Sequence, residues 1–188
     1  MFKKTAAALL IAGFAASPAL AQDQKTLVNE AKGIIKGFAT ELQGELKAGF
    51  QRGGPTEAIS VCNTKAPGIA DKASKTSGWS VGRSSHKLRN MNNAPDAFEA
   101  RAIKELLGRQ AKGEKAADMG IAMTTIEDGK KTFRFVKAIP TGKVCLACHG
   151  TNIAPEVEAK LKELYPMDTA RGFSEGEMRG IFTLRKEL

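Results

Sequence analysis

Cysteine and histidine are scarce in this chain, which has three cysteines and two histidines among 188 residues. A structural zinc site takes four ligands, so it would need four of these five residues, and their spacing is not that of a zinc finger. Aromatic residues are also few, with one Trp, one Tyr and nine Phe. There is no internal repeat and no low-complexity segment, while 42% of the residues are hydrophobic. The composition therefore favours one folded domain over a repeat protein or a disordered chain.

The chain also lacks any tract of clustered lysine and arginine with aromatic residues between them. Its formal net charge is +9, but the 29 basic residues are spread along the sequence among 20 acidic ones. We therefore expect no nucleic-acid partner. A solvated surface with a basic bias is the simplest interpretation, and a redox partner protein with an acidic surface is the functional alternative.

The first residues have the pattern of an export signal. Lys3 and Lys4 precede the short apolar run Thr5–Ala16, Pro18 interrupts it, and Ala19–Ala21 forms a small-residue cleavage site. We predict a signal peptide over residues 1–21, cleaved after Ala21, and a single domain over residues 22–188 in a bacterial periplasm. The apolar run is shorter than the roughly 20 residues that span a bilayer. No membrane span is expected in the mature chain.

The N-terminal part of the mature chain predicts helices. Apolar residues recur at helical spacing from Lys25 to Phe50, which indicates a long N-terminal helix. Arg52–Pro55, with the sequence RGGP, predicts its end and the start of another element. Thr56–Thr64 predicts a second helix that carries Cys62, and Pro67 interrupts or restarts it.

The rest of the chain mixes strands and helices. The strongest hairpin signal is Met119–Pro140, where two β-prone runs flank an Asp-Gly turn. Further strands are expected at Gly78–Arg83 and 177–188, and helices from about Asn93 to Arg109 and at Ala154–Tyr165. This order predicts an α+β fold with an antiparallel sheet.

The sequence Cys145-Leu-Ala-Cys148-His149 is the attachment signature of c-type haem. Each thiol adds across one haem vinyl group, and the following histidine then lies under the porphyrin with a nitrogen directed at the iron. The spacing thus predicts one covalent haem c with His149 as an axial ligand. A thioredoxin-like redox pair and a plain disulfide are the alternatives. The loop-like residues before Cys145, and the absence of that family's typical Trp and Pro, disfavour the redox pair.

The residues alone leave the second axial ligand of the iron undecided, and an iron with no second protein ligand is one of the alternatives. Electron-transfer cytochromes commonly use Met or His there. Cys62 is an unpaired thiol in an oxidising compartment, so it is either a small buried residue or a ligand. His86 lies in a polar segment typical of a solvated turn. The methionines that remain as candidates are Met91, Met119, Met123, Met167 and Met178. Arg83 and Arg89 flank the same polar segment and are candidate partners of the haem propionates.

Four segments together resemble the Tll-type c-haem domain family. They are Ala58–Asp71, Val81–Glu99, Cys145–Gly150 and Ala170–Leu184, which occur in the family's order, and the match as a whole covers nearly the whole mature chain. The resemblance implies a PAS-like fold, with a central antiparallel sheet, flanking helices and one covalent haem. It also implies an axial pair of His149 and Cys62. Met91 replaces a proline usual in the family, and His86 stands where an apolar residue is usual.

A single-haem electron carrier in the periplasm is the function that these features favour. The alternative is a haem-based redox or gas sensor, in which the reduced form binds a small gas and signals through a separate partner. An enzyme would need an open iron site and distal acid–base groups, and only His86 could supply a distal imidazole. We therefore expect no catalytic residues.

Overall fold

The computed structural model describes residues 18–188, with side chains from residue 23 onward. The predicted apolar core of the signal peptide, Thr5–Ala16, lies outside the described residues. Within residues 18–188, no helix is both long and apolar enough to cross a membrane.

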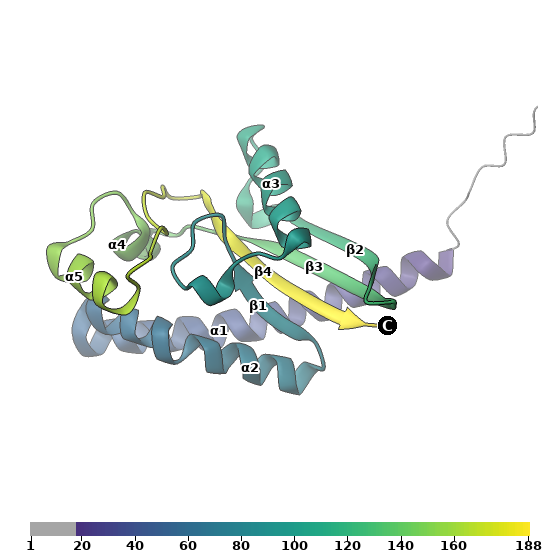
Figure 1. Cartoon of the computed structure of the whole chain (residues 1–188), viewed down its shortest axis with the longest axis horizontal. Coiled ribbons are helices and arrows are strands. Elements are labelled where there is room, and N and C mark those ends of the chain that lie inside the picture. Colours follow the sequence, from purple (N-terminus) through teal and green to yellow (C-terminus); the bar gives the residue numbers. More distant parts are fainter. Residues whose placement is uncertain (1–17) are drawn as a thin grey trace, which may run out of the picture.

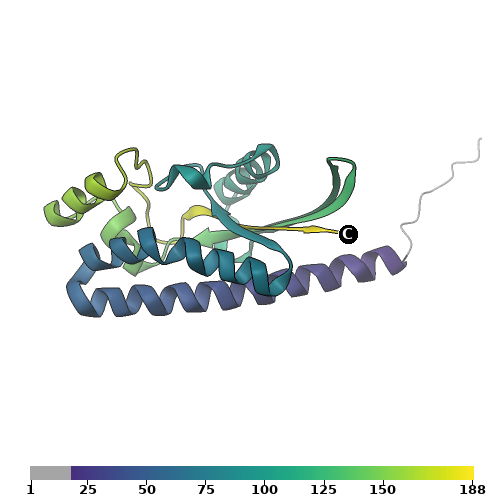
Figure 2. The same cartoon turned by 60° about the horizontal axis from the view of Figure 1, so that its bottom comes forward.

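Two helical arms form a hairpin along one side of the molecule. Helix α1 runs over Pro18–Thr64, but its backbone leaves the helical conformation at Gly53 and Gly54. Gly54 has φ 67° and ψ −156°, a region almost restricted to glycine, so the chain can reverse there. The predicted break at RGGP is thereby confirmed. Figure 2 shows the second arm of α1 and helix α2 (Ala66–Ser77) returning beside the first arm.

Four antiparallel strands form one sheet in the order β1-β4-β3-β2. The last strand in the sequence therefore lies inside the sheet, between the first and the third. The β2–β3 hairpin turns through Asp128 and Gly129, both with positive φ, as the Asp-Gly pair predicts. The strands are β1 (Ser80–Ser84), β2 (Gly120–Glu127), β3 (Lys130–Pro140) and β4 (Met178–Glu187).

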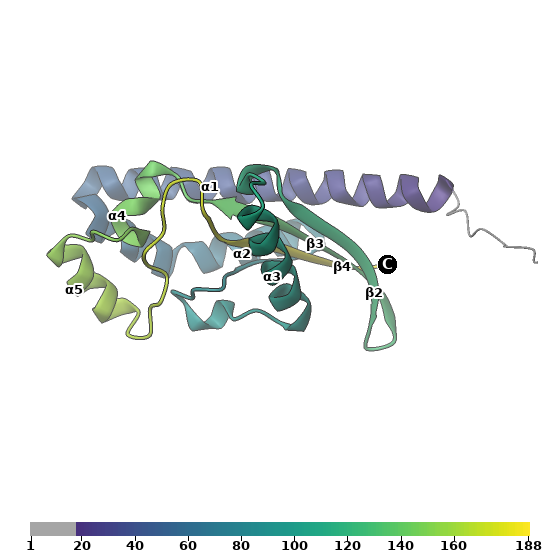
Figure 3. The same cartoon turned by 90° about the horizontal axis from the view of Figure 1, so that it is seen from above.

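Helices cover both faces of the sheet (Figures 1 and 3). Phe133 and Phe135 of β3 point to the face covered by α1, where they pack with Trp79. Val136 and Ala138 point to the opposite face, which helix α3 (Ala97–Ala111) covers. The alternation along β3 thus buries the strand on both sides, and the predicted α+β class is confirmed.

Helix α3 begins later than the sequence predicts. Residues 91–93 form a short 3-10 turn, and Asp96 is the N-cap, in a capping box with Glu99. The helix therefore begins at Ala97, four residues beyond Asn93, and Asp96 and Glu99 mark its start. A second 3-10 turn, Ala116–Asp118, leads from α3 into β2.

The Cys-x-x-Cys-His motif lies at the end of the molecule where α1 turns back (Figure 1). A 3-10 turn (Lys143–Cys145) and the one-turn helix α4 (Leu146–His149) follow β3 directly. Helix α5 (Pro155–Leu164) then packs Val157 and Leu161 against Ile59 on the returning arm of α1. This packing places the motif beside the arm that carries Cys62.

Candidate haem site

A cavity of about 770 Å³ lies between the helical hairpin, the adjacent sheet end and the motif. Its volume is in the range of small-molecule and cofactor pockets. Cys145, Cys148 and His149 line it together with Cys62. The apolar part of the wall comes largely from the two arms of α1, at Leu42, Leu46, Phe50, Ala58 and Ile59.

The two ring nitrogens of His149 have different partners. Nδ1–H donates to the backbone carbonyl of Ala170 at 2.8 Å, and Nε2 accepts from Nη1 of Arg89 at 3.3 Å. A carbonyl can only accept and a guanidinium can only donate, so these partners fix the tautomer with the proton on Nδ1. The Nε2 lone pair is the coordinating group of the ring, and a metal ion bound to it would replace the bond from Arg89.

Burial keeps the His149 ring neutral. Removal from water, and then the charges of Arg89 and Arg179, lower its pKa to about 3, although the bond to Ala170 and the charge of Asp168 oppose them. A neutral imidazole is the form that binds a metal. The ring therefore needs no deprotonation before it can act as a ligand at neutral pH.

Arg89 is held by a buried carboxylate that the sequence analysis missed. Its Nε and Nη2 donate to the two oxygens of Asp168 at 3.2 and 3.1 Å, and the Asp168 side chain is only 1% exposed. Nη2 also donates to the carbonyl of Cys148 at 2.5 Å. Arg89 lines the cavity as expected of a propionate partner, but most of its donors are used within the protein. Asp168 is 79 residues from Arg89, and no local sequence motif predicts that they pair.

Cys62 reaches the cavity from the returning arm of α1. All three cysteines are free thiols. Burial raises the pKa of the Cys62 thiol, while Arg83, Arg179 and Arg89 favour its thiolate. Burial also raises the pKa of Cys148, to about 11. A metal ion bound to Cys62 would displace its proton, and three nearby cations would stabilise the resulting charge.

The other candidate axial ligands lie away from the cavity wall. The His86 ring packs edge-on against Phe173 at 5.7 Å, and Phe173 in turn contacts the His149 ring at 6.2 Å. His86 itself does not line the cavity. None of the five candidate methionines lines the cavity. Met119 and Met178 are buried under α3, while Met91, Met123 and Met167 are exposed.

Arg83 and Arg179 give the cavity an excess of positive charge. Burial and the charge of Arg179 lower the pKa of Arg83, whose guanidinium lies over the Phe38 ring at 5.4 Å. Nε of Arg179 is buried without a hydrogen-bond partner. Among residues 23–188, neither guanidinium has a carboxylate in ion-pair contact. Two such cations lining one cavity fit an anionic group, such as a haem propionate.

A family model described as Tll0287-like matches residues 14–186. The chain belongs to the Tll0287-like family. Among solved structures it is similar to the crystal structure of the cyanobacterial heme-protein Tll0287, with 22% identity and a TM-score of 0.60. The match covers 90% of this chain and 95% of that one. It confirms the expected α+β fold, with a long N-terminal helix and a four-stranded antiparallel sheet flanked by helices. A search of the curated proteins finds no match.

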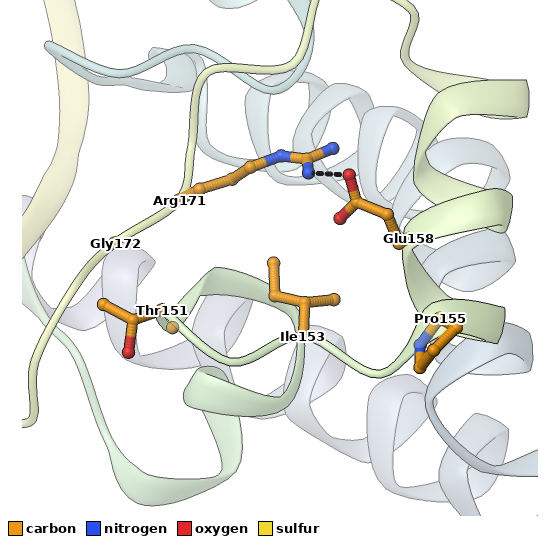
Figure 4. A pocket seen from close by; sticks show the side chains of 7 residues that line it. Thr151, Ile153, Pro155, Glu158, Arg171 and Gly172 are labelled. Carbon is orange, nitrogen blue, oxygen red and sulfur yellow. Dashed lines mark hydrogen bonds and ion pairs between the residues drawn. The ribbon is translucent and has the colours of Figure 1, made fainter.

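A second hollow of about 640 Å³ lies next to the motif in this member of the family (Figure 4). Gly150 and Thr151, which directly follow His149, form one side of it. Arg171 and Glu158 point toward each other across it and form an ion pair. Arg171 also donates to Asp168, so its charge is already balanced within the protein. This hollow therefore lacks the unpaired cations of the larger cavity.

Proposed function

We propose that the protein is a c-type cytochrome with one haem, attached through Cys145 and Cys148, with His149 and Cys62 as axial ligands. One observation carries the proposal: among the described residues, a single cavity is lined by the complete attachment motif and by one further free thiol. The solved relative named above is a heme-protein, which supports the same cofactor here.

A bound haem supplies one-electron exchange, and the chain's residues set the conditions for it. The bond from Nδ1–H of His149 to Ala170 would leave Nε2 as the nitrogen that binds the iron. Arg83 and Arg179 would hold the propionates of the haem, and Leu42, Leu46 and other apolar residues of α1 would exclude water from it. A thiolate ligand donates charge to iron and stabilises its ferric form. We therefore expect a reduction potential below that of cytochromes with Met/His ligation.

The proposed role is electron transfer in the periplasm after signal-peptide removal. Cleavage after Ala21 removes Lys3 and Lys4 and lowers the formal net charge from +9 to +7. A basic protein of this kind would associate fastest with an acidic redox partner, and the rate would fall with ionic strength.

The decisive experiment compares visible absorption and EPR spectra of the exported protein and two variants. We expect a low-spin ferric thiolate signal in the wild type that is lost in Cys62→Ala. It should be retained in His86→Ala, the matched control, because His86 does not line the cavity. A signal unchanged by Cys62→Ala would refute the axial assignment. A pyridine haemochrome spectrum tests covalent attachment, and mass spectrometry tests the start of the mature chain at Gln22.

Reduced protein mixed with CO separates a carrier from a sensor. A carrier with both axial positions filled should exchange electrons rapidly and bind CO slowly. Rapid CO binding together with slow electron exchange would favour the gas-sensor alternative.

A further inference from the structure

Arg89 connects three segments that are far apart in the sequence. It lies after β1, and it contacts both the attachment motif and the loop that precedes β4. Its Nη2 donates to the carbonyls of Cys148 and Ala170 at 2.5 and 3.2 Å, and its Nε donates to Asp168 at 3.2 Å. The Arg89 side chain is 12% exposed, so water competes little for these bonds. The backbone on both sides of the His149 ring is thus held by one side chain.

Asp168 fixes the same loop from the other side. Its Oδ1 accepts the backbone N–H of Ala170 at 2.9 Å, and its Oδ2 accepts from Arg89 and Arg171. Since the carbonyl of Ala170 is the acceptor for Nδ1–H of His149, the carboxylate holds the residue that orients the ring. Further backbone bonds support the arrangement, because the Phe173 N–H donates to the carbonyl of His149 at 2.9 Å.

We propose that the Arg89–Asp168 pair positions His149 and sets how electron-rich its imidazole is. The proposal rests on His149 being the axial ligand of the proposed function. It assigns Arg89 a different part from Arg83 and Arg179: those two have unpaired charge for an anionic group, whereas Arg89 has its own buried carboxylate.

The carbonyl of Ala170, which His149 and Arg89 share, explains in which direction Arg89 should shift the reduction potential. The oxygen of Ala170 accepts from both His149 and Arg89, so less of its electron density is available to the imidazole N–H. A weaker Nδ1–H bond makes the ring a poorer donor to iron, which favours the reduced form. The positive charge of Arg89 acts in the same direction, and the negative charge of Asp168 acts against it.

One contact of Arg89 must be lost when iron binds. Nη1 donates to the Nε2 lone pair of His149, and a metal would take the same lone pair. The bonds that Arg89 makes to Asp168, Cys148 and Ala170 do not use Nε2 of His149, so they can persist when that nitrogen binds iron.

The test measures the reduction potential of exported holoprotein with single charges removed. Arg89→Gln should lower the potential and Asp168→Asn should raise it, while the double variant should lie near the wild type. Arg89→Lys keeps the charge but loses the fork that binds two carbonyls, so its potential should fall less than that of Arg89→Gln. Arg101→Gln removes an exposed cation from α3 and serves as the control, with no shift expected.

Shifts of Arg89→Gln and Asp168→Asn in the same direction would indicate loosened structure and overturn the proposal. An Arg89→Lys potential equal to that of the wild type would also overturn it, because charge alone would then account for the effect. If Arg89→Gln does not fold, Asp168→Asn and Arg89→Lys still decide between these outcomes. Failure of the proposed function is seen separately, as a wild-type protein without covalent haem in the haemochrome assay.

Discussion

Substituting Gly180 by alanine should open the sheet at the wall of the haem cavity. A Cβ at this position would lie 2.5 Å from the carbonyl oxygen of Ser84 and 3.3 Å from Cβ of Ser85. The Ser84 carbonyl is backbone in the β1–β4 pairing, so it cannot turn aside as a flexible side chain could. Overpacking a well-packed interior costs about 1–3 kcal/mol, and a backbone clash should lie at the upper end. We therefore expect Gly180→Ala to lose about 3 kcal/mol of unfolding free energy.

The same substitution at Gly37 supplies the control. Gly37 is exposed in the middle of the first arm of α1, and a Cβ there meets nothing within 4 Å. Alanine in a helix interior is favoured over glycine by about 0.5–1 kcal/mol, so Gly37→Ala should be more stable than the wild type. Urea unfolding followed by far-UV circular dichroism measures both. At about 2–4 °C per kcal/mol, Gly180→Ala should also melt about 6–12 °C lower. A Gly180→Ala protein as stable as the wild type would refute the close approach of β1 and β4.

Two further predictions concern the ion network between α3 and the sheet. Arg134 is 4% exposed and pairs with Asp96, Glu99 and Glu127. Arg134→Met removes the ion-pair partner of the buried Glu99, while Glu127 keeps its pair with Arg185 and the Asp96 side chain is 48% exposed. The substitution should therefore cost about 3 kcal/mol in urea unfolding, whereas the exposed Arg101→Met should change it little. Burial alone would raise the pKa of Asp96, but the Glu99 N–H and Arg134 outweigh it and hold that pKa below its usual value. The folded-state pKa is therefore lower than the unfolded one, so this stabilisation is present above about pH 4 and is lost as the pH falls further. Melting temperatures measured from pH 7 to pH 2.5 should fall less steeply in Asp96→Asn, and an identical slope would contradict this reasoning.

Local chemistry in the sequence accounts for most of the elements. The Gly53–Gly54 turn, the Asp128–Gly129 hairpin and the Asp96 capping box each depend on residues that are neighbours in the chain. Each could therefore be predicted without a structure. The predicted start of α3 is too early because Asn93 and Asp96 are both good N-cap residues. The spacing of Asp96 and Glu99, which is that of a capping box, is the local signal that identifies the observed start. The strand order could not be predicted from local sequence either, because it depends on which strand lies between β1 and β3.

The candidate site divides in the same way. Cys145, Cys148 and His149 belong to one short motif, so their spacing in the sequence predicts that they lie at the same site. Asp168 could not be found, because its role depends on a pairing with Arg89 across 79 residues. From the sequence, His86 and five methionines are axial candidates in addition to Cys62. In the structure, Cys62 lines the cavity and the other six do not.

The position of β4 within the sheet has a consequence for biosynthesis. Residues 178–187 pair with β1 on one side and β3 on the other, yet they leave the ribosome after both of these strands. Until they are made, β1 and the β2–β3 hairpin have no shared partner, and both present open edges. Sheet closure is consequently a late, long-range event, for which slow folding is expected. If the protein is exported and carries covalent haem as we propose, late closure of the sheet would keep the chain unfolded while it is threaded through a secretion channel. Its cysteines would then stay accessible to an attachment machinery until β4 arrives.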